Sequence, residues 1–390
     1  MSRIFIGTSG WSYSDWENVF YKSEKHKLKK YCMVFNTVEV DSTFYSYPSI
    51  ELIKGLINST PDGFVFTAKL PSLITHQKRL DLSKGVEKDL DRFIELMQPV
   101  NRAGKLASLL IQLPPRYSYD KYYEVFREFL DLTVGEFRYA VEFRDLSWLR
   151  EDVLNLLSKY DVAYTIVDEP LLPPYTYITT DFAYIRWHGR GRNPWYYYHY
   201  SLGELNEWKQ KILEVRDKVG RVYGYFNNHF KGYAVHNALQ VLEILEIITP
   251  TQRKILEEVE KNLREVKVQQ PSHMLHLLPE KLPEKIEELL AMLTDRVRLK
   301  RAKEITKDLI EVREATEQHL SAKVKDYNII IDLEKRIIIH DCADWSRTRT
   351  SLSFCKHLNA LILNIDEGYA RRVLEDVIIN RSLWSFIENV

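Results

Sequence analysis

The stretch Ala183-Tyr-Ile-Arg-Trp-His-Gly-Arg190 decides the predicted fold. Because successive side chains of a strand point to opposite faces, Tyr184, Arg186 and His188 share one face, and the apolar residues between them share the other. The polar residues gather toward the C-terminal end of the strand. In a barrel of parallel strands, the inner face is packed at the N-terminal end and carries the active site at the C-terminal end. The stretch therefore favours a strand of a (β/α) barrel.

Seven other segments have the length and pattern of buried strands. In chain order they are 3–11, 37–43, 64–69, 109–114, 139–144, 163–168 and 221–228. Most segments between them have helical periodicity, among them 202–219, where Ser201 and Glu204 have the spacing of a capping box. No clear helix is expected over 171–180. Eight strands with mostly helical crossovers predict an α/β fold, a TIM (β/α)8-like barrel over residues 1–248.

A single barrel takes roughly 250 residues, so a chain of 390 residues is expected to hold a second module. We expect a helical linker region over 249–300 and a small α+β zinc-finger module over 301–390. Within these ranges the pattern predicts a long charged helix from about Glu284 to Leu320. Short strands are predicted after it, at 321–325, 327–333 and 336–341.

The composition limits the classes of partner. The chain has 55 basic and 55 acidic residues. It therefore has no net positive charge that would by itself attract nucleic acid. No apolar run approaches the roughly 18 residues of a membrane span, and no signal peptide precedes the first strand. We therefore expect a soluble, cytoplasmic protein without membrane contact. Three cysteines are too few for a disulfide framework and leave a metal site or buried thiols as the options.

The clearest chemical motif pairs His340-Asp-Cys342 with Cys355-Lys-His357, after twelve intervening residues. Zinc prefers four nitrogen or sulfur ligands in a tetrahedron, and two pairs held by short turns provide them. The spacing predicts a structural zinc site; the alternative is buried thiols beside surface histidines. Basic residues between and beside the ligands would either contact phosphates or form a solvated surface. They are Arg347, Arg349 and Lys356.

Polar side chains are expected to converge at the C-terminal mouth of the barrel, where barrel enzymes place their sites. They are Glu39, Asp41, Lys69, Gln112, Glu142, Arg144, Asp168, Arg186, His188 and Asn227. The carboxylates and imidazole could hold a divalent metal that activates water, as nuclease barrels do. Alternatively, the lysine and arginines compete for the same carboxylates. The mouth would then be a set of paired ions that binds phosphate through its arginines or serves a purely structural role.

The strand ends carry motifs that resemble the YecE-like family, known as domain of unknown function 72, over about residues 3–248. The motifs are Ile6-Gly-Thr-Ser-Gly-Trp11, Thr37-Val-Glu-Val-Asp-Ser-Thr-Phe-Tyr45, Lys69 with Thr75-His76, Gln112-Leu-Pro-Pro115, Glu142-Phe-Arg144, Ile185-Arg-Trp-His-Gly189 and Tyr225-Phe-Asn-Asn-His229. The resemblance implies a TIM barrel. It implies no settled reaction, because the family has none established, and the family is likened to the endonuclease IV branch of barrels only at the level of fold.

The paired Cys/His motif resembles the SWIM zinc finger over roughly residues 301–363. That family has the pattern Cys-x-Cys, loop, Cys-x-His, with an Asp-Trp soon after the second cysteine, and Asp344-Trp345 stand in that place here. This chain departs from the pattern in one respect, because His340 replaces the first cysteine. Histidine is an acceptable zinc ligand, so we expect a Cys2His2 site with altered affinity.

These observations favour a nucleic-acid-processing protein. In this hypothesis the barrel is a metal-dependent, nuclease-like hydrolase, and the finger binds DNA, single-stranded DNA included, or a DNA-bound protein partner. The support is the finger together with the arginines and aromatic residues near the mouth. A first alternative is a non-enzymatic DNA- or protein-binding factor of repair or recombination. A second is a sugar-phosphate-type barrel enzyme whose finger serves assembly.

Overall fold

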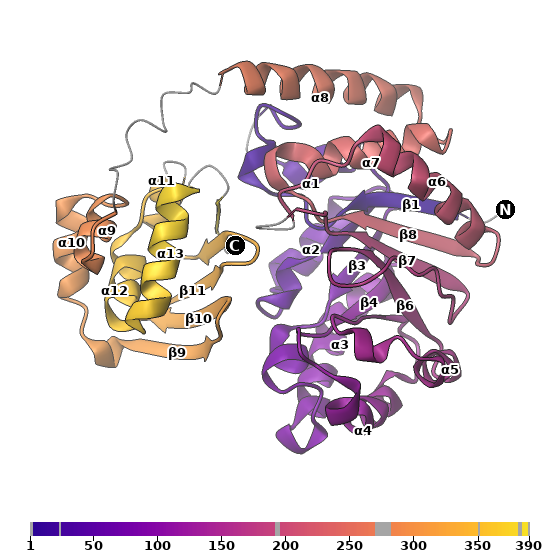
Figure 1. Ribbon diagram of the computed structural model, residues 1–390, viewed down its shortest axis with the longest axis horizontal. Coiled ribbons are helices and arrows are strands. Elements are labelled where there is room, and N and C mark those ends of the chain that lie inside the picture. Colours follow the sequence, from indigo (N-terminus) through magenta and orange to yellow (C-terminus); the bar gives the residue numbers. More distant parts are fainter. Residues whose placement is uncertain are drawn as a thin grey trace. The chain divides into compact units, whose positions relative to one another are not determined.

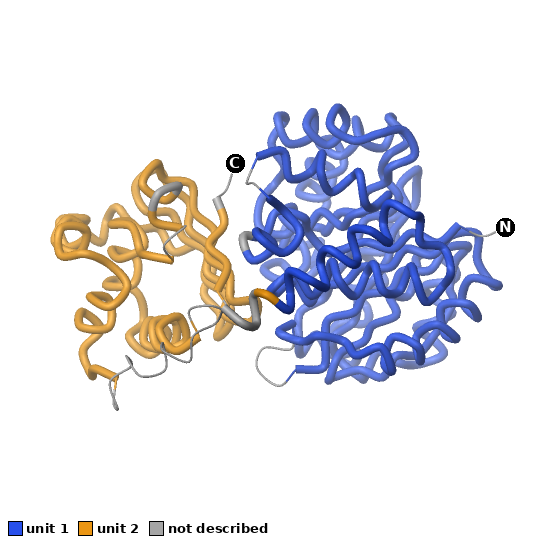
Figure 2. The backbone as a smooth tube through the Cα atoms, turned by 90° about the horizontal axis from the view of Figure 1, so that it is seen from above, with its two compact units in different colours: residues 1–264 blue, residues 265–390 orange. Residues whose placement is uncertain are grey.

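The computed structural model describes residues 3–22, 25–191, 196–269, 282–349, 352–380 and 384–388. The chain divides into two compact units, residues 1–264 and residues 265–390 (Figure 2). Each unit has its own sheet and its own apolar core.

Unit 1 is a barrel of eight parallel strands, which confirms the predicted fold class (Figure 1). The strands are β1 (Arg3–Thr8), β2 (Thr37–Val40), β3 (Val65–Lys69), β4 (Leu106–Gln112), β5 (Tyr139–Glu142), β6 (Val162–Asp168), β7 (Phe182–Trp187) and β8 (Arg221–Phe226). Hydrogen-bonded neighbours follow the order β1-β8-β7-β6-β5-β4-β3-β2. All eight predicted strands are therefore present in the expected order.

The helices of unit 1 follow the strands as expected for βα crossovers. They are α1 (Lys27–Tyr31), α2 (Ile50–Asn58), α3 (Val86–Arg102), α4 (Tyr119–Leu130), α5 (Glu151–Lys159), α6 (Leu202–Arg216), α7 (Tyr233–Ile244) and α8 (Pro250–Gln269), which runs past the end of unit 1 at Arg264. The predicted capping box begins α6: the hydroxyl of Ser201 accepts the amide hydrogen of Glu204, and the Glu204 carboxylate accepts that of Ser201. The described residues between β6 and β7 form no helix, as predicted.

Helix α8 packs against the barrel for most of its length. The side-chain amide of Gln252 donates to the carbonyl of Val34 at 2.6 Å, and that of Asn262 donates to the carbonyl of Val19 at 2.9 Å. These contacts explain why the compact barrel unit extends to Arg264.

The barrel closes at the seam between β1 and β2, where the sheet is joined by a single bridge, Ser9 to Glu39. Below this bridge the phenol oxygen of Tyr31 lies between the strands, where it accepts the amide hydrogen of Thr8 at 2.9 Å and lies 3.2 Å from the carbonyl of Thr37. Gly7 makes room for this arrangement, because a Cβ there would lie 2.3 Å from the Thr37 carbonyl oxygen. The seam thus depends on one glycine and one tyrosine.

The inside of the barrel is layered from apolar to charged. Phe5, Ala107, Phe182 and Tyr223 belong to the apolar cluster that fills it. Next, the hydroxyls of Tyr184 and Tyr225 pair with threonines, each at 2.8 Å. They reach Thr67 on β3 and Thr37 on β2, respectively. Charged residues follow toward the C-terminal ends of the strands.

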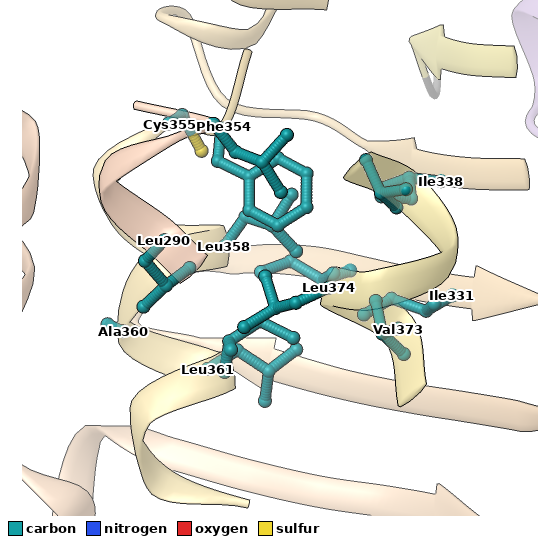
Figure 3. Packing of buried hydrophobic residues seen from close by; sticks show 14 of the residues in the cluster. Leu290, Ile331, Ile338, Phe354, Cys355, Leu358, Ala360, Leu361, Val373 and Leu374 are labelled. Carbon is teal, nitrogen blue, oxygen red and sulfur yellow. The ribbon is translucent and has the colours of Figure 1, made fainter. Parts of the chain in front are cut away.

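Unit 2 holds a five-stranded sheet in the order β13-β12-β11-β10-β9. The strands are β9 (Ile310–Ala315), β10 (His319–Val324), β11 (Tyr327–Asp332), β12 (Ile337–His340) and β13 (Ser385–Glu388). The helices are α9 (Ile286–Ala291), α10 (Arg296–Lys303), α11 (Trp345–Thr348), α12 (Lys356–Asn364) and α13 (Glu367–Ile379). Residues of α9, α12 and α13 form one apolar core with the sheet, in which Cys355 lies beside Phe354 (Figure 3).

The single helix predicted from Glu284 to Leu320 is wrong. Leu293 is buried after the end of α9, and the Asp295 carboxylate accepts the amide hydrogen of Arg298 to begin α10 as a separate helix. The strand β9 then lies at the edge of the sheet, where half of its six residues are charged and four are exposed. A charged edge strand lacks the alternation of a half-buried strand, so its sequence resembles a solvated helix.

No helix in the part of the chain that the structure describes is both long enough and apolar enough to cross a membrane.

Candidate functional site

Arg186 on β7 is the centre of the charged layer in the barrel. Its Nη2 donates to the Glu39 carboxylate at 2.7 Å, and its Nη1 donates to the Glu142 carboxylate at 2.6 Å. The side chains of all three residues are fully buried. Burial alone would lower the pKa of Arg186, but Glu142 and Glu39 outweigh it and raise that pKa above its ordinary value. Two buried carboxylates therefore share one buried guanidinium.

The remaining polar atoms of this layer are provided by neighbouring strands. The Tyr184 hydroxyl donates to Glu39 at 2.6 Å, and Gln112 accepts from Arg186 at 3.3 Å. Ser9, which the sequence interpretation did not include, lies within hydrogen-bond reach of both Glu39 and Arg186. The layer therefore joins β1, β2, β4, β5 and β7 through side chains.

Arg144 forms a second ionic centre directly after β5. Its Nε donates to Glu142 at 2.7 Å, and its Nη1 lies 2.9 Å from the Glu169 carboxylate. Burial would raise the pKa of Glu142, but Arg144 and Arg186 hold it well below its usual range. Glu142 is therefore ionised and bridges the two arginines.

His188 contacts both arginines, Glu142 and Asn227 through its ring nitrogens. The amide nitrogen of Asn227 lies 2.9 Å from Nδ1, and the Glu142 carboxylate lies 3.3 Å from Nε2. Nη2 of Arg144 and Nη1 of Arg186 also lie 3.3 Å from Nε2, so one carboxylate and two guanidinium groups surround this nitrogen. Burial holds the pKa of His188 well below its usual value, so the imidazole is neutral.

Asp41 and Lys69 form a third pair at the mouth. Their charged atoms are 2.7 Å apart, and the Lys69 ammonium lies 5.2 Å from the centre of the Phe44 ring. Tyr13 stacks on His229 with ring centres 4.3 Å apart. Burial raises the pKa of Tyr13 well above its usual value, and the charges of Asp41 and Glu39 raise it further. The phenol is therefore protonated.

Asp168 does not belong to the mouth, which corrects the sequence interpretation. It lies on the outer face of β6, where Arg190 binds it bidentately at 2.8 Å and the indole of Trp208 on α6 donates to it. Strand alternation gives the reason, because Asp168 shares its face with Ile166, whereas Glu169 shares the inner face with Thr165. Glu169 is the inward carboxylate, and counting this alternation from the strand interior would have found it.

The described mouth is a network of paired ions. Glu39, Asp41, Glu142 and Glu169 face Lys69, Arg144 and Arg186. The paired groups are almost fully buried. Within the described ranges, one group of three or more His, Cys, Asp or Glu side chains converges closely enough to hold a metal ion, and that group lies in unit 2.

That group is His340, Cys342, Cys355 and His357, the four residues predicted from spacing. Their ligand atoms lie within 4.8 Å of one another, and all four residues are buried. His340 ends β12, Cys355 is the residue before α12, and His357 lies in the first turn of that helix. A turn after β12 brings Cys342 to the N-terminal end of α12.

The protonation of the four residues fits a metal site. Nδ1 of His340 lies 2.6 Å from the carbonyl of Asn328, so it carries the proton and leaves the Nε2 lone pair for a metal. Nε2 of His340 and Nδ1 of His357 are buried without a hydrogen-bond partner among the described residues. The Cys355 thiol donates to Cys342 and lowers the pKa of Cys342, while burial raises that of Cys355.

Surrounding side chains hold the ligands in place. The ring of Tyr327 lies 4.7 Å from that of His357, and the ring of Trp345 lies 5.5 Å from that of His340. The Asp341 carboxylate accepts both the backbone and the side-chain amide of Asn328, each at 2.9 Å, and so fixes the carbonyl that His340 contacts. Such outer contacts orient metal ligands before the metal binds.

Comparison with known proteins identifies the barrel unit. The family model described as "Protein of unknown function DUF72" matches residues 5–261. The chain belongs to this family. The expected resemblance is therefore confirmed for the barrel, while the comparisons name no SWIM-type finger for unit 2.

Relatives of this DUF72 chain match over the barrel. The UPF0759 protein YunF of Bacillus subtilis is 27% identical in an alignment of 270 residues that covers 63% of this chain and 95% of YunF. The UPF0759 protein YecE of Escherichia coli is 31% identical over 141 residues, 36% of this chain and 48% of YecE. A DUF72 family structure from Thermotoga maritima has a TM-score of 0.56 at 32% identity, covering 63% of this chain and 99% of that one. None of these names states a reaction.

Proposed function

We propose that this DUF72 protein binds one structural zinc ion through His340, Cys342, Cys355 and His357, and that unit 2 uses the resulting fold to bind nucleic acid. The observation that carries the proposal is the convergence of four buried side chains, two of which have a ring nitrogen without a hydrogen-bond partner among the described residues. A buried polar atom without a partner costs free energy unless a ligand satisfies it. Two cysteines and two histidines suit zinc, and four protein ligands leave no open position for a reaction.

The same reasoning favours the paired-ion alternative for the barrel. A divalent metal at the mouth would have to displace Arg186 or Arg144 from carboxylates that they already neutralise. Phosphate binding by these arginines would also have to displace carboxylates, because both guanidinium groups already donate to protein side chains. We therefore propose a barrel whose ionic network positions the mouth without a metal. A nuclease-like hydrolase remains the alternative that a turnover assay tests.

Metal analysis tests the zinc site directly. The purified full-length chain should hold one zinc ion, and the double variant Cys342→Ser/Cys355→Ser should hold none, because serine is a poor zinc ligand. Cys32→Ser is the matched control, since Cys32 lies in the barrel unit, outside the cluster, and its loss should leave the zinc content unchanged. A zinc-free wild-type chain, or full zinc content in the double variant, would contradict the proposal.

Nucleic-acid binding is tested with labelled single-stranded DNA and the full-length zinc protein. The expected result is an affinity that falls as salt rises, because phosphate contacts release counterions. Incubation of the same DNA with magnesium or manganese tests the hydrolase alternative. Cleavage that is lost in Glu142→Gln would favour a hydrolytic barrel over the metal-free network, whereas binding without cleavage supports the proposal.

A further inference from the structure

We infer that the nucleic-acid phosphates bind at a cavity beside the zinc ligands, and this inference rests on the proposed function of unit 2. The cavity has a volume of about 450 Å³. It is lined by Asp295, Val297, Arg298, Arg301, Asp344 and Lys356. Three cations and two carboxylates therefore face one space.

The carboxylates are occupied by one of the three cations. Arg298 donates from Nε and Nη2 to the Asp344 carboxylate, at 2.9 and 3.1 Å, and from Nη1 to Asp295. Among the described residues, no carboxylate lies within salt-bridge distance of Arg301 or Lys356, the other two cations of the lining. The cavity thus keeps two positive charges that an anion of the phosphate class can neutralise.

The surrounding helix adds further positive charge. Helix α10 also carries Arg296, Lys300 and Lys303, all exposed, and it packs along α12. Of these three, Lys303 pairs with Glu287 at 2.7 Å. A phosphate chain leaving the cavity would therefore meet further cations along α10, which suits a polyanion better than a single phosphate ion.

The cavity is built on the metal ligands themselves. Lys356 lies between Cys355 and His357, and Asp344 follows Cys342 by two residues. The amide of Trp345 donates to the carbonyl of Cys342 at 2.8 Å, which fixes the turn that carries Asp344. Zinc would hold this turn and the start of α12 together, so the two unpaired cations should face the cavity only while the metal site is formed.

The test compares two double variants of the full-length zinc protein. Arg301→Gln/Lys356→Gln removes the unpaired cations of the cavity. Lys307→Gln/Lys325→Gln removes two exposed lysines of the same unit that do not line the cavity. Both variants lose two positive charges, so an effect of net charge alone would be equal in the two. Zinc content and thermal unfolding show whether each variant keeps its fold.

Affinity for a labelled single-stranded oligonucleotide is measured over a range of salt concentrations. We expect the cavity variant to bind about tenfold or more weakly at low salt, with a salt slope lower by about 1.4, since each lost phosphate contact removes about 0.7. The control variant should keep the wild-type slope. Equal losses in both variants, or no loss in the cavity variant, would overturn the inference. A wild-type chain that holds zinc but binds no DNA would instead contradict the proposed function.

Discussion

Arg186 shows how a charged residue can be part of a barrel core. It is fully buried, and so are the two carboxylates that it binds. Removing one partner of such a group leaves unpaired charge in the interior, which costs roughly 3 to 5 kcal/mol. We therefore expect Arg186→Met to lower the free energy of unfolding by about that amount, measured by urea denaturation at neutral pH.

Arg138 offers a matched control for this prediction. It also binds a carboxylate with two nitrogens, at 2.6 and 3.1 Å, but its partner Asp181 and Arg138 itself are both more than one third exposed. Exposed pairs contribute about 0 to 1 kcal/mol, so Arg138→Met should be mild. A loss for Arg186→Met as small as that for Arg138→Met would mean that the network does not stabilise the barrel.

His188 should make the stability of the barrel depend on pH. Burial holds the pKa of the folded imidazole well below its usual value, while the unfolded residue titrates near 6.5. The unfolded state therefore takes up a proton first. The stabilising contribution of the neutral imidazole is complete above about pH 6.5. It is lost as pH falls below that value, at up to about 1.4 kcal/mol per pH unit.

The measurement is the free energy of unfolding of wild type and His188→Gln between pH 7.5 and 5.5, a range chosen to bracket about 6.5. The difference between the two proteins should shrink as the pH falls, because the glutamine has no proton to take up. A constant difference for His188→Gln would show that the imidazole is not held neutral.

At the scale of residues, the sequence predicted side-chain types better than side-chain directions. Arg186 and His188 were placed correctly because their strand shows a clean alternation. Asp168 was placed on the wrong face because β6 is buried on both sides, and its apolar run hides which residues point inward. The four residues of the Cys/His cluster are predicted correctly because the required spacing lies in the sequence itself.

At the scale of elements, the seam between β1 and β2 is where the barrel is held by the fewest backbone bonds. A Cβ on Gly7 would lie 2.3 Å from the Thr37 carbonyl and 3.0 Å from the Tyr31 hydroxyl. Gly7→Ala should therefore force the strands apart or displace Tyr31, with a loss of about 1 to 3 kcal/mol, the usual cost of overpacking. Thermal unfolding of the full chain measures the effect.

Gly55 in α2 is the control, because a glycine-to-alanine change there should not lower stability. A Cβ there would meet nothing within 4 Å, and alanine is favoured over glycine in a helix interior by up to about 1 kcal/mol. Gly55→Ala should thus be neutral or stabilising. If both variants behaved alike, the steric account of the seam would be wrong.

The sequence predicts correctly the elements whose residues are mostly apolar and buried. The eight barrel strands are of this kind, since each packs against neighbours on the inside and the outside of the barrel. The break between α9 and α10 and the strand β9 were missed, because they depend on the burial of Leu293 and on an edge position in a sheet. Such features follow from tertiary packing and leave little local signal.

At the scale of the whole molecule, the sequence indicated two modules from length and from the zinc motif. The boundary between the two compact units depends on α8. Contacts of this helix with Val19 and Val34 join it to the barrel unit, which ends at Arg264. Those contacts connect residues more than 200 positions apart. No local pattern encodes them.

Zinc should stabilise unit 2 and leave unit 1 unchanged, because the four ligands and the core around Cys355 lie in unit 2 alone. A metal that binds only the folded state, at a free concentration of one hundred times its Kd, stabilises by about 2.7 kcal/mol. Removing it with a chelator should shift one of two thermal transitions of the full chain to lower temperature. Gly7→Ala assigns the other transition to the barrel, since that residue belongs to unit 1. If chelation moved the transition that Gly7→Ala moves, zinc would act on the barrel, and the four-ligand cluster would not be the site that matters for folding.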